Sequence, residues 1–212
     1  MAFPETIRNS KWLRRPLLSA SKFLLTPLKA GPAILRRAAY DAMPLPYLVT
    51  GDREIFIVST ADKVIGRELF LHGEFDFRKM ETAIAILERE GQSRPRHLID
   101  VGTNIGTIVI PALKRGLMQT ATAIEPHPGN LKLLHANLAL NSLTDQVNVL
   151  GIAIGAQADK TLFLKESPSN GGNHSISDNG IQIHSTRLDD LDVQLDGSLL
   201  WMDIEGYEGH AL

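Results

Sequence analysis

The sequence of 212 residues contains no cysteine and no long apolar run. Without cysteine the chain cannot form a disulfide bond, a thiolate nucleophile or a cysteine-ligated metal site. A membrane-spanning helix needs roughly 18–20 consecutive apolar residues, and Arg, Lys or Pro interrupts every apolar stretch of this chain. The composition, 43% hydrophobic and 22% charged, is typical of one soluble globular domain with an additional segment. We therefore expect a cytoplasmic protein that does not span a membrane.

Residues 1–45 are predicted to be a basic N-terminal extension. Residues 1–40 carry eight Lys and Arg side chains against one acidic residue, Glu5, a net +7, so the remainder carries −9 of the net charge of −2. Apolar residues between these charges would permit contact with an anionic membrane surface, but prolines prevent one long amphipathic helix. We expect the extension to pack on the domain instead. A cleaved secretion signal is disfavoured because Arg14 and Arg15 interrupt its hydrophobic region, whereas an organelle transit peptide stays open.

Residues 46–212 are predicted to form one α/β domain. A small β/α element leads into it over residues 50–90, called here the leading β/α element. Its β-branched run at 54–58 predicts a strand, and apolar residues at helical spacing predict a helix over 77–90 that ends at Gly91.

Strand and helix patterns alternate from residue 97. The strands are short and apolar without alternation, which implies a mostly parallel sheet with helices on both faces. Pro111 lies inside the first predicted helix, so we expect a bend there. The predicted strands are 97–101, 121–125, 147–154 and 198–206, the predicted helices are 105–115 and 128–141, and 161–164 with 181–184 form an inserted hairpin.

The segment DVGTNIG at residues 100–106 stands where a parallel strand turns into a helix. Gly102 and Gly106 allow the backbone to approach a ligand closely. Glu125 follows Asp100 by 25 residues and ends the next strand, where a carboxylate can accept both hydroxyls of a ribose. This combination predicts a nucleotide cradle.

The details of the cradle favour one cofactor over another. Asn104 stands where the dinucleotide fingerprint has its second glycine, so there is no evident bed for a pyrophosphate, and NAD is the weaker candidate. Asp100 instead suits a ligand with a positive ammonium or sulfonium group, such as S-adenosylmethionine.

Four motifs in order resemble the FkbM family of S-adenosylmethionine-dependent methyltransferases. They are LIDVGTNIG at 98–106, IEP at 124–126, TRLDD at 186–190 and MDIEGYE at 202–208. The resemblance covers about residues 50–212. It implies a Rossmann-like class I methyltransferase fold and, usually, O-methylation of sugars, polyketides or other secondary metabolites.

The chain departs from that family in two ways. Members commonly have Lys two residues before the position of Asp203, whereas this chain has Trp201. The family also continues for several strands past this point, so the C-terminal strands of the fold are expected to be missing.

The candidate catalytic residues are two carboxylates and a histidine. Asp203 and Glu205 share one face of a strand by its period of two, at the carboxyl edge where open α/β sheets bind ligands, and Asp203 is the preferred base. His174 and His184, on or beside the hairpin, are alternative bases because imidazole titrates near the working pH. The candidate cofactor-binding residues are Asp100, Gly102, Thr103, Asn104, Gly106, Glu125 and Pro126.

Other polar residues are expected to be structural. His97 starts a strand at the edge away from the ligand, and Asp189 and Asp190 fit a helix cap and a solvated side chain. No metal is required, and no residue spacing supports a metal site.

Two other functions stay open from the sequence. One is a non-catalytic S-adenosylmethionine-binding module or fragment, and the other is an NAD-binding oxidoreductase. The expected acceptor is a small molecule or glycan. Nucleic acid is not expected because the domain is acidic.

Overall fold

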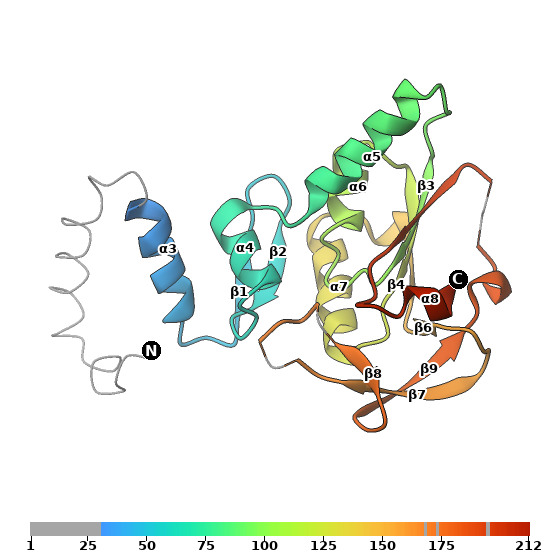
Figure 1. Ribbon diagram of the computed structural model, residues 1–212. Helices are drawn as coiled ribbons and strands as arrows, with labels where there is room; N and C mark the ends of the chain where they lie inside the picture. Colours follow the sequence, from blue (N-terminus) through green and yellow to red (C-terminus); the bar gives the residue numbers. More distant parts are fainter. Residues whose placement is uncertain (1–30, 168, 173, 194–195) are drawn as a thin grey trace, which may run out of the picture.

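The computed structural model describes residues 31–212 except 168, 173, 194 and 195 (Figure 1). The apolar and basic residues on which the membrane and transit-peptide interpretations depend lie mostly in residues 1–30, outside the described part. Among the described helices, none combines the length and hydrophobicity that crossing a lipid bilayer demands.

The first described helix, α3, falls within the predicted extension and packs on the leading β/α element through Tyr40. This side chain is fully buried, and its hydroxyl lies 2.8 Å from the carbonyl oxygen of Ser59 and 2.7 Å from that of Asp62. The last helix of the group, α5, matches the helix predicted over 77–90. The elements are α3 (Gly31–Asp41), β1 (Tyr47–Thr50), β2 (Phe56–Ser59), α4 (Ile65–His72) and α5 (Phe77–Arg89).

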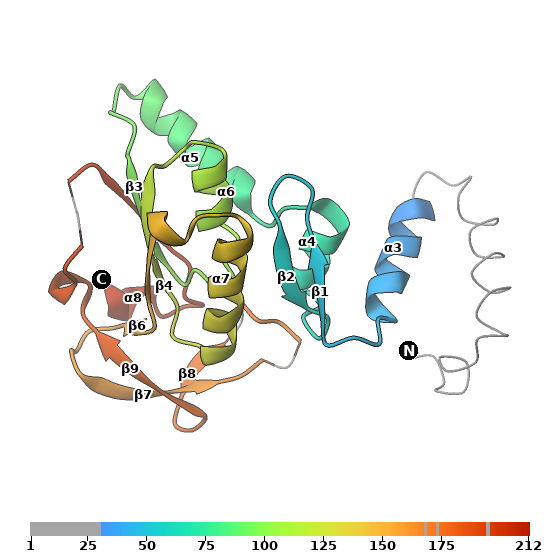
Figure 2. The ribbon, with the colours of Figure 1, turned by 180° about the vertical axis from the view of Figure 1, so that it is seen from behind.

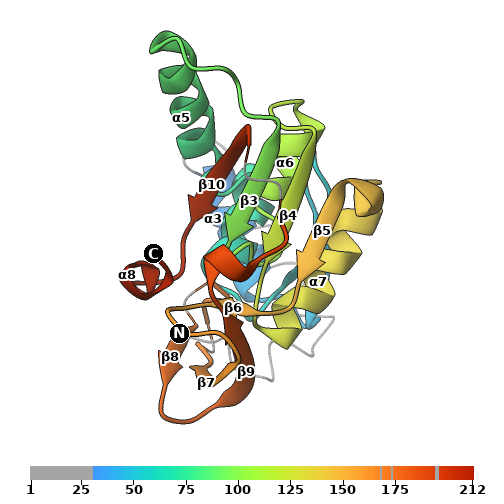
Figure 3. The same cartoon turned by 90° about the vertical axis from the view of Figure 1, so that its right-hand side faces the viewer.

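The centre of the molecule is a four-stranded parallel sheet, as predicted. Its strand order is β10-β3-β4-β5, and Figure 3 shows these four strands side by side. Trp201 of β10 is paired with Asp100 of β3, and Asp100 with Ala123 of β4, so the carboxyl ends of the three strands meet at one edge. The strands are β3 (His97–Val101), β4 (Thr120–Ile124), β5 (Val147–Leu150) and β10 (Ser198–Met202).

Helices cover the two faces of this sheet unequally. One face, which includes Leu98, packs against α5, α6 (Val109–Lys114) and α7 (Pro128–Leu140) (Figure 2). The other face, which includes Ile99, is covered by loops, and its described helical segments are only the short η2 (Leu188–Asp190) and α8 (Glu208–Ala211). Helices therefore cover the first face as predicted, whereas the described helical segments on the second face are short.

The predicted helix over 105–115 is shorter than expected, because residues 104–108 form turns and α6 begins at Val109. Pro111 is thus the third residue of the helix. The first four N–H groups of a helix have no intrahelical partner, so the missing N–H of proline costs nothing there. The proline therefore lies in the first turn of α6 and not in the interior of a longer helix, where the bend was expected.

The strand predicted over 147–154 is two strands in two sheets. β5 ends at Leu150 in the parallel sheet, and after Gly151 and Ile152 the chain enters β6 (Ala153–Ile154) in a second sheet. A Cβ on Gly151 would lie 3.0 Å from Leu131 Cδ1, so the chain passes close under α7 where it changes sheets.

The second sheet contains the predicted hairpin and has the order β6-β9-β7-β8. β7 and β9 are antiparallel, with Leu162 opposite Ile183. The segment between them carries a further short strand that the sequence pattern did not indicate. The strands are β7 (Lys160–Lys165), β8 (Ser175–Ser177) and β9 (Ile181–Thr186).

The strand predicted over 198–206 ends at Met202. Glu205 has a φ of 55° and Gly206 a φ of 85°, a left-handed conformation that a strand does not contain. Asp203 and Glu205 therefore lie in a turn after β10, and the prediction that they share one face of a strand was wrong.

Candidate functional site

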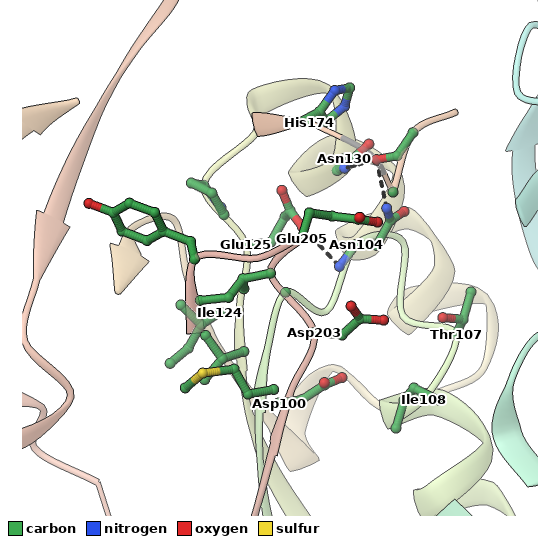
Figure 4. A pocket seen from close by; sticks show the side chains of 18 of the residues that line it. Asp100, Asn104, Thr107, Ile108, Ile124, Glu125, Asn130, His174, Asp203 and Glu205 are labelled. Atoms are coloured by element: carbon green, nitrogen blue, oxygen red, sulfur yellow. Dashed lines mark hydrogen bonds between the residues drawn. The ribbon is translucent and has the colours of Figure 1, made fainter. Parts of the chain in front are cut away.

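A cavity of about 560 Å³ opens where the carboxyl ends of β3, β4 and β10 meet (Figure 4). Its walls come from the loop after β3, the ends of β4 and β10, the starts of α4 and α5, and the segment that precedes β8. It lies at the edge where the sequence predicted the cradle.

The loop after β3 has three residues in the left-handed region: Gly102, Asn104 and Gly106, with φ of 86°, 57° and 96°. A Cβ on Gly102 would lie 2.1 Å from the carbonyl oxygen of Asp203, so only glycine lets this loop lie against the end of β10. A Cβ on Gly106 would meet Ile110 at 2.7 Å. Gly106 therefore serves helix packing, and it does not line the cavity.

Glu125 fixes the conformation of the loop from the neighbouring strand. Its carboxylate accepts hydrogen bonds from the backbone N–H of Asn104 at 2.9 Å and of His127 at 2.8 Å. Burial raises the pKa of Glu125 to about 7, although the backbone donors oppose this shift. Each carboxylate oxygen has two lone-pair sites, so Glu125 can still accept from a ligand in the cavity that it lines.

Asp100 and Asn104 each have a buried side-chain oxygen that lacks a hydrogen-bond partner. Among the described residues, Asp100 Oδ2 and Asn104 Oδ1 are buried side-chain oxygens without a hydrogen-bond partner, and both residues line the cavity. Burial, together with the nearby carboxylates of Glu125 and Asp203, raises the pKa of Asp100 to about 7. Unpaired buried acceptors are costly, so both oxygens call for a donor from a ligand.

The remaining predicted cofactor residues differ in position. Pro126 lines the cavity, whereas Thr103 does not. The hydroxyl of Thr103 donates at 2.7 Å to the backbone oxygen of Asp100, which closes the turn behind the cradle.

Asp203 and Glu205 line the cavity from the turn after β10. The backbone N–H of Asp203 donates to the Val101 carbonyl at 3.0 Å, which extends the β10–β3 ladder by one bond. Figure 4 shows the side chains of both residues facing the loop that carries Asn104. Burial and the charge of Asp203 raise the pKa of Glu205. The two carboxylates are thus next to the cradle even though they do not share a strand.

His174 lines the cavity but is a poor base in this geometry. Its Nδ1 accepts a hydrogen bond from the backbone N–H of Ser167 at 3.1 Å, so the proton of the neutral ring resides on Nε2. The ring lies 4.1 Å from that of His127, and burial together with that neighbour lowers the pKa of His174. The free ring nitrogen is therefore a donor.

The alternative base His184 and two residues predicted to be structural, Asp190 and His97, lie outside the cavity. His184 is exposed on β9, and Asp190 pairs with Arg187. His97 is buried at the other end of β3, where its ring nitrogens lie within 2.8 and 3.1 Å of two threonine hydroxyls. Among the residues with described positions, no three His, Cys, Asp or Glu side chains form a cluster that could hold a metal ion.

The sequence analysis missed the contribution of the leading β/α element. Asp76 and Lys79, at the start of α5, line the cavity, and Lys79 Nζ lies 2.7 Å from Asp76 Oδ2. Lys79 is the only Lys or Arg among the described lining residues. The sequence gives no local signal for this, because it follows from how α5 packs on the sheet.

Solved structures with partial similarity to this chain include the following two. The methyltransferase FkbM of Methylobacillus flagellatus is 22% identical, with a TM-score of 0.40, over 58% of this chain and 30% of that one. Trm5 of Methanocaldococcus jannaschii, in complex with adenosine, is 16% identical, with a TM-score of 0.33, over 56% of this chain and 39% of that one. The chain thus spans well under half the length of these relatives.

The curated proteins contain no match to this chain. The family described as Methyltransferase FkbM domain matches residues 100–212. That range includes the loop after β3, Glu125 and the turn after β10, and it contains most of the residues that line the cavity. The chain belongs to the FkbM methyltransferase family.

Proposed function

We propose that the chain binds S-adenosylmethionine in this cavity and methylates a hydroxyl group of a small molecule or glycan. The observation that carries the proposal is the pair of unpaired buried oxygens, Asp100 Oδ2 and Asn104 Oδ1, in one cavity with Glu125. The cofactor offers matching donors, namely an ammonium group and two ribose hydroxyls. When bound, it supplies a methyl group on a positively charged sulfur.

The residues proposed to bind the cofactor lie at the ends of β3 and β4, and those proposed to bind the acceptor lie after β10. Asp100 and Asn104 would accept hydrogen bonds from the cofactor, and Glu125 would accept from its ribose. Gly102 keeps the loop in place beside β10. These residues orient the cofactor, and alignment of the reacting atoms supplies much of the rate enhancement in such a transfer.

Methylation would form a bond from the acceptor oxygen to the methyl carbon while the bond from that carbon to sulfur breaks and leaves its electron pair on sulfur. The acceptor hydroxyl would lose its proton in this step. Asp203 is the proposed proton acceptor, and Glu205 binds the acceptor molecule. His174, whose free nitrogen carries a proton, would donate a hydrogen bond to a bound molecule rather than take a proton from it.

The charge of the cavity also bears on the acceptor. Its lining contains five carboxylate residues and one lysine: Asp76, Asp100, Glu125, Asp203, Glu205 and Lys79. This balance supports a neutral, hydroxyl-bearing acceptor and disfavours nucleic acid. We also keep the cytoplasm as the proposed compartment.

Calorimetric titration with S-adenosylhomocysteine and, separately, with NAD tests the cofactor. We expect the first to bind and to raise the melting temperature by mass action, and the second to do neither. Tight binding of NAD without binding of S-adenosylhomocysteine would support the oxidoreductase alternative. Transfer of a labelled methyl group to a set of polyhydroxylated acceptors then separates an enzyme from a binding module.

A further inference from the structure

Residues 169–172, called here the strap, cross the cavity between β7 and β8. Asn170, Gly171 and Gly172 line the cavity, although the strap connects two strands of the second sheet. It is thus a separate piece of wall brought over the cradle from a distant part of the sequence.

The strap is fastened to the cradle through one carbonyl group. The Gly171 oxygen accepts a hydrogen bond from the side-chain amide of Asn104 at 2.7 Å and another from that of Asn130 at 3.0 Å. Both asparagines are 7% exposed. One comes from the loop after β3 and the other from α7, so this carbonyl joins the strap to two elements of the parallel-sheet region.

The strap is also fastened to the leading β/α element. The Gly171 N–H donates to Asp62 Oδ2 at 3.2 Å, and the Lys63 N–H donates to the Ser169 carbonyl at 2.7 Å. Four hydrogen bonds therefore hold four residues to three elements that are remote in the sequence.

Close packing agrees with these bonds. A Cβ on Gly171 would lie 3.0 Å from Asp62 Oδ2, and a Cβ on Gly172 would lie 2.7 Å from Ile65 Cδ1. A side chain at either position would require Asp62, Ile65 or the strap itself to shift.

Asn104 connects the strap to the ligand side of the cavity. Its amide nitrogen holds Gly171, while its amide oxygen is buried, unpaired and in a residue that lines the cavity. A donor from a bound molecule would therefore fix the same side chain that holds the strap. Asn130, which holds the same carbonyl, also lines the cavity.

We propose that the strap closes the cofactor end of the cavity, and that Asp62 is a positioning residue that sets how long the cofactor stays bound. This inference rests on the proposed cofactor site. Asp62 does not line the cavity, so it acts on the cofactor only through Gly171. Release of the cofactor requires the strap to open, and each lost hydrogen bond makes opening easier.

The test measures dissociation of S-adenosylhomocysteine from the full chain by stopped-flow displacement. Asp62→Ala should speed dissociation about 10-fold, the effect of losing one hydrogen bond of about 1.4 kcal/mol, with little change in the association rate. Asp62→Asn keeps an acceptor oxygen and should restore a rate near that of the wild type. Glu68→Ala is the matched control, because it removes a carboxylate from the same element without touching the strap.

Hydrogen exchange of the strap amides in the ligand-free protein gives a second readout. Asp62→Ala should raise this exchange, and S-adenosylhomocysteine should lower it in the wild type. Asp62 also accepts from the Val64 N–H at 2.8 Å, so Gly171→Ala provides a variant that keeps that bond and should show the same faster dissociation.

Wild-type dissociation rates in both Asp62→Ala and Gly171→Ala would overturn the role of the strap. Unchanged strap exchange in ligand-free Asp62→Ala would also overturn it. If the wild type itself binds no S-adenosylhomocysteine, the proposed function fails, and the role in cofactor retention fails with it. A calorimetric titration of the wild type that shows no heat of binding is enough to identify that case.

Discussion

The two walls of the cavity differ in how firmly the protein holds them. The wall formed by β3 and β4 is proposed to bind the cofactor and is called here the cofactor wall. In it, Asp100 and Glu125 are 1% and 5% exposed, and backbone groups fix the carboxylate of Glu125. The wall formed by the start of α5 and the turn after β10 is proposed to bind the acceptor and is called here the acceptor wall. Its side chains Asp76 and Lys79 are 40% and 67% exposed, and Asp203 and Glu205 lie in a turn. A rigid wall suits the single cofactor that we propose, whereas a looser one can adapt to the proposed acceptor.

The largest effect is expected where the leading β/α element joins α6. Arg115 pairs with the buried Glu54 at 2.9 Å and with Glu74 at 3.3 Å, and it packs over the ring of Phe77. Arg115→Met leaves the buried Glu54 with only the long 4.0 Å contact to Arg53, which should cost about 3–5 kcal/mol of the free energy of unfolding. Urea denaturation measures this loss.

Arg94→Met is the control for that substitution. Arg94 pairs with Glu88 on the surface, and its loss should cost less than about 1 kcal/mol. Equal losses in the two variants would show that the leading element is not anchored through Arg115.

Asp203→Asn tests the chemistry of the acceptor wall. It keeps the shape of the side chain but removes the proton acceptor, so kcat should fall by about 10²-fold or more. Glu205→Gln should act mainly through the KM of the acceptor. If both variants turn over at the wild-type rate, the carboxylates after β10 are structural.

Asp100→Asn should improve the stability of the ligand-free protein while it weakens cofactor binding. Burial raises the pKa of Asp100 to about 7 from an ordinary value near 4, so the folded state favours the protonated form. The stability from protonation is complete below about pH 4 and is lost as the pH rises through 7. At pH 8 the substitution should therefore stabilise the protein by about 1–3 kcal/mol.

Thermal melting of wild type and Asp100→Asn at pH 5 and pH 8 checks this prediction. The difference in melting temperature between the two proteins should be larger at pH 8. A difference that is larger at pH 5 would contradict the buried charge.

The smallest effect is expected for Lys79→Ala. Its ion pair with Asp76 is exposed and contributes little to stability, so folding and cofactor affinity should not change. The KM of the acceptor should change by about 2- to 5-fold, because Lys79 is the cation at that wall. Arg78→Ala, on the same helix and 88% exposed, is the control and should leave KM unchanged.

The sequence predicted the loop after β3 and the position of Glu125 better than the turn after β10, for a physical reason. The loop after β3 and the position of Glu125 follow from local features, namely short buried strands, turn glycines and their spacing. The end of β10 does not, because the turn depends on the left-handed Glu205 and on Gly102 making room for the carbonyl of Asp203.

The parts of the cavity that come from distant segments were also out of reach. Nothing near Lys79 or Gly171 in the sequence indicates that either residue lines the same cavity as Asp100. Their positions follow from the packing of α5 and of the second sheet on the parallel sheet. The shorter α6 and the division of the strand at Gly151 likewise depend on tertiary contacts.

The most direct test compares the two walls in one calorimetric titration with S-adenosylhomocysteine. Glu125→Ala should lose roughly 1–3 kcal/mol of binding free energy, because it removes a charged acceptor of the ribose hydroxyls. Asp203→Asn should bind as the wild type does. Melting curves of both variants confirm that each is folded at the temperature of the titration. Full affinity in Glu125→Ala, or an equal loss in Asp203→Asn, would contradict the assignment of the cofactor to the wall formed by β3 and β4.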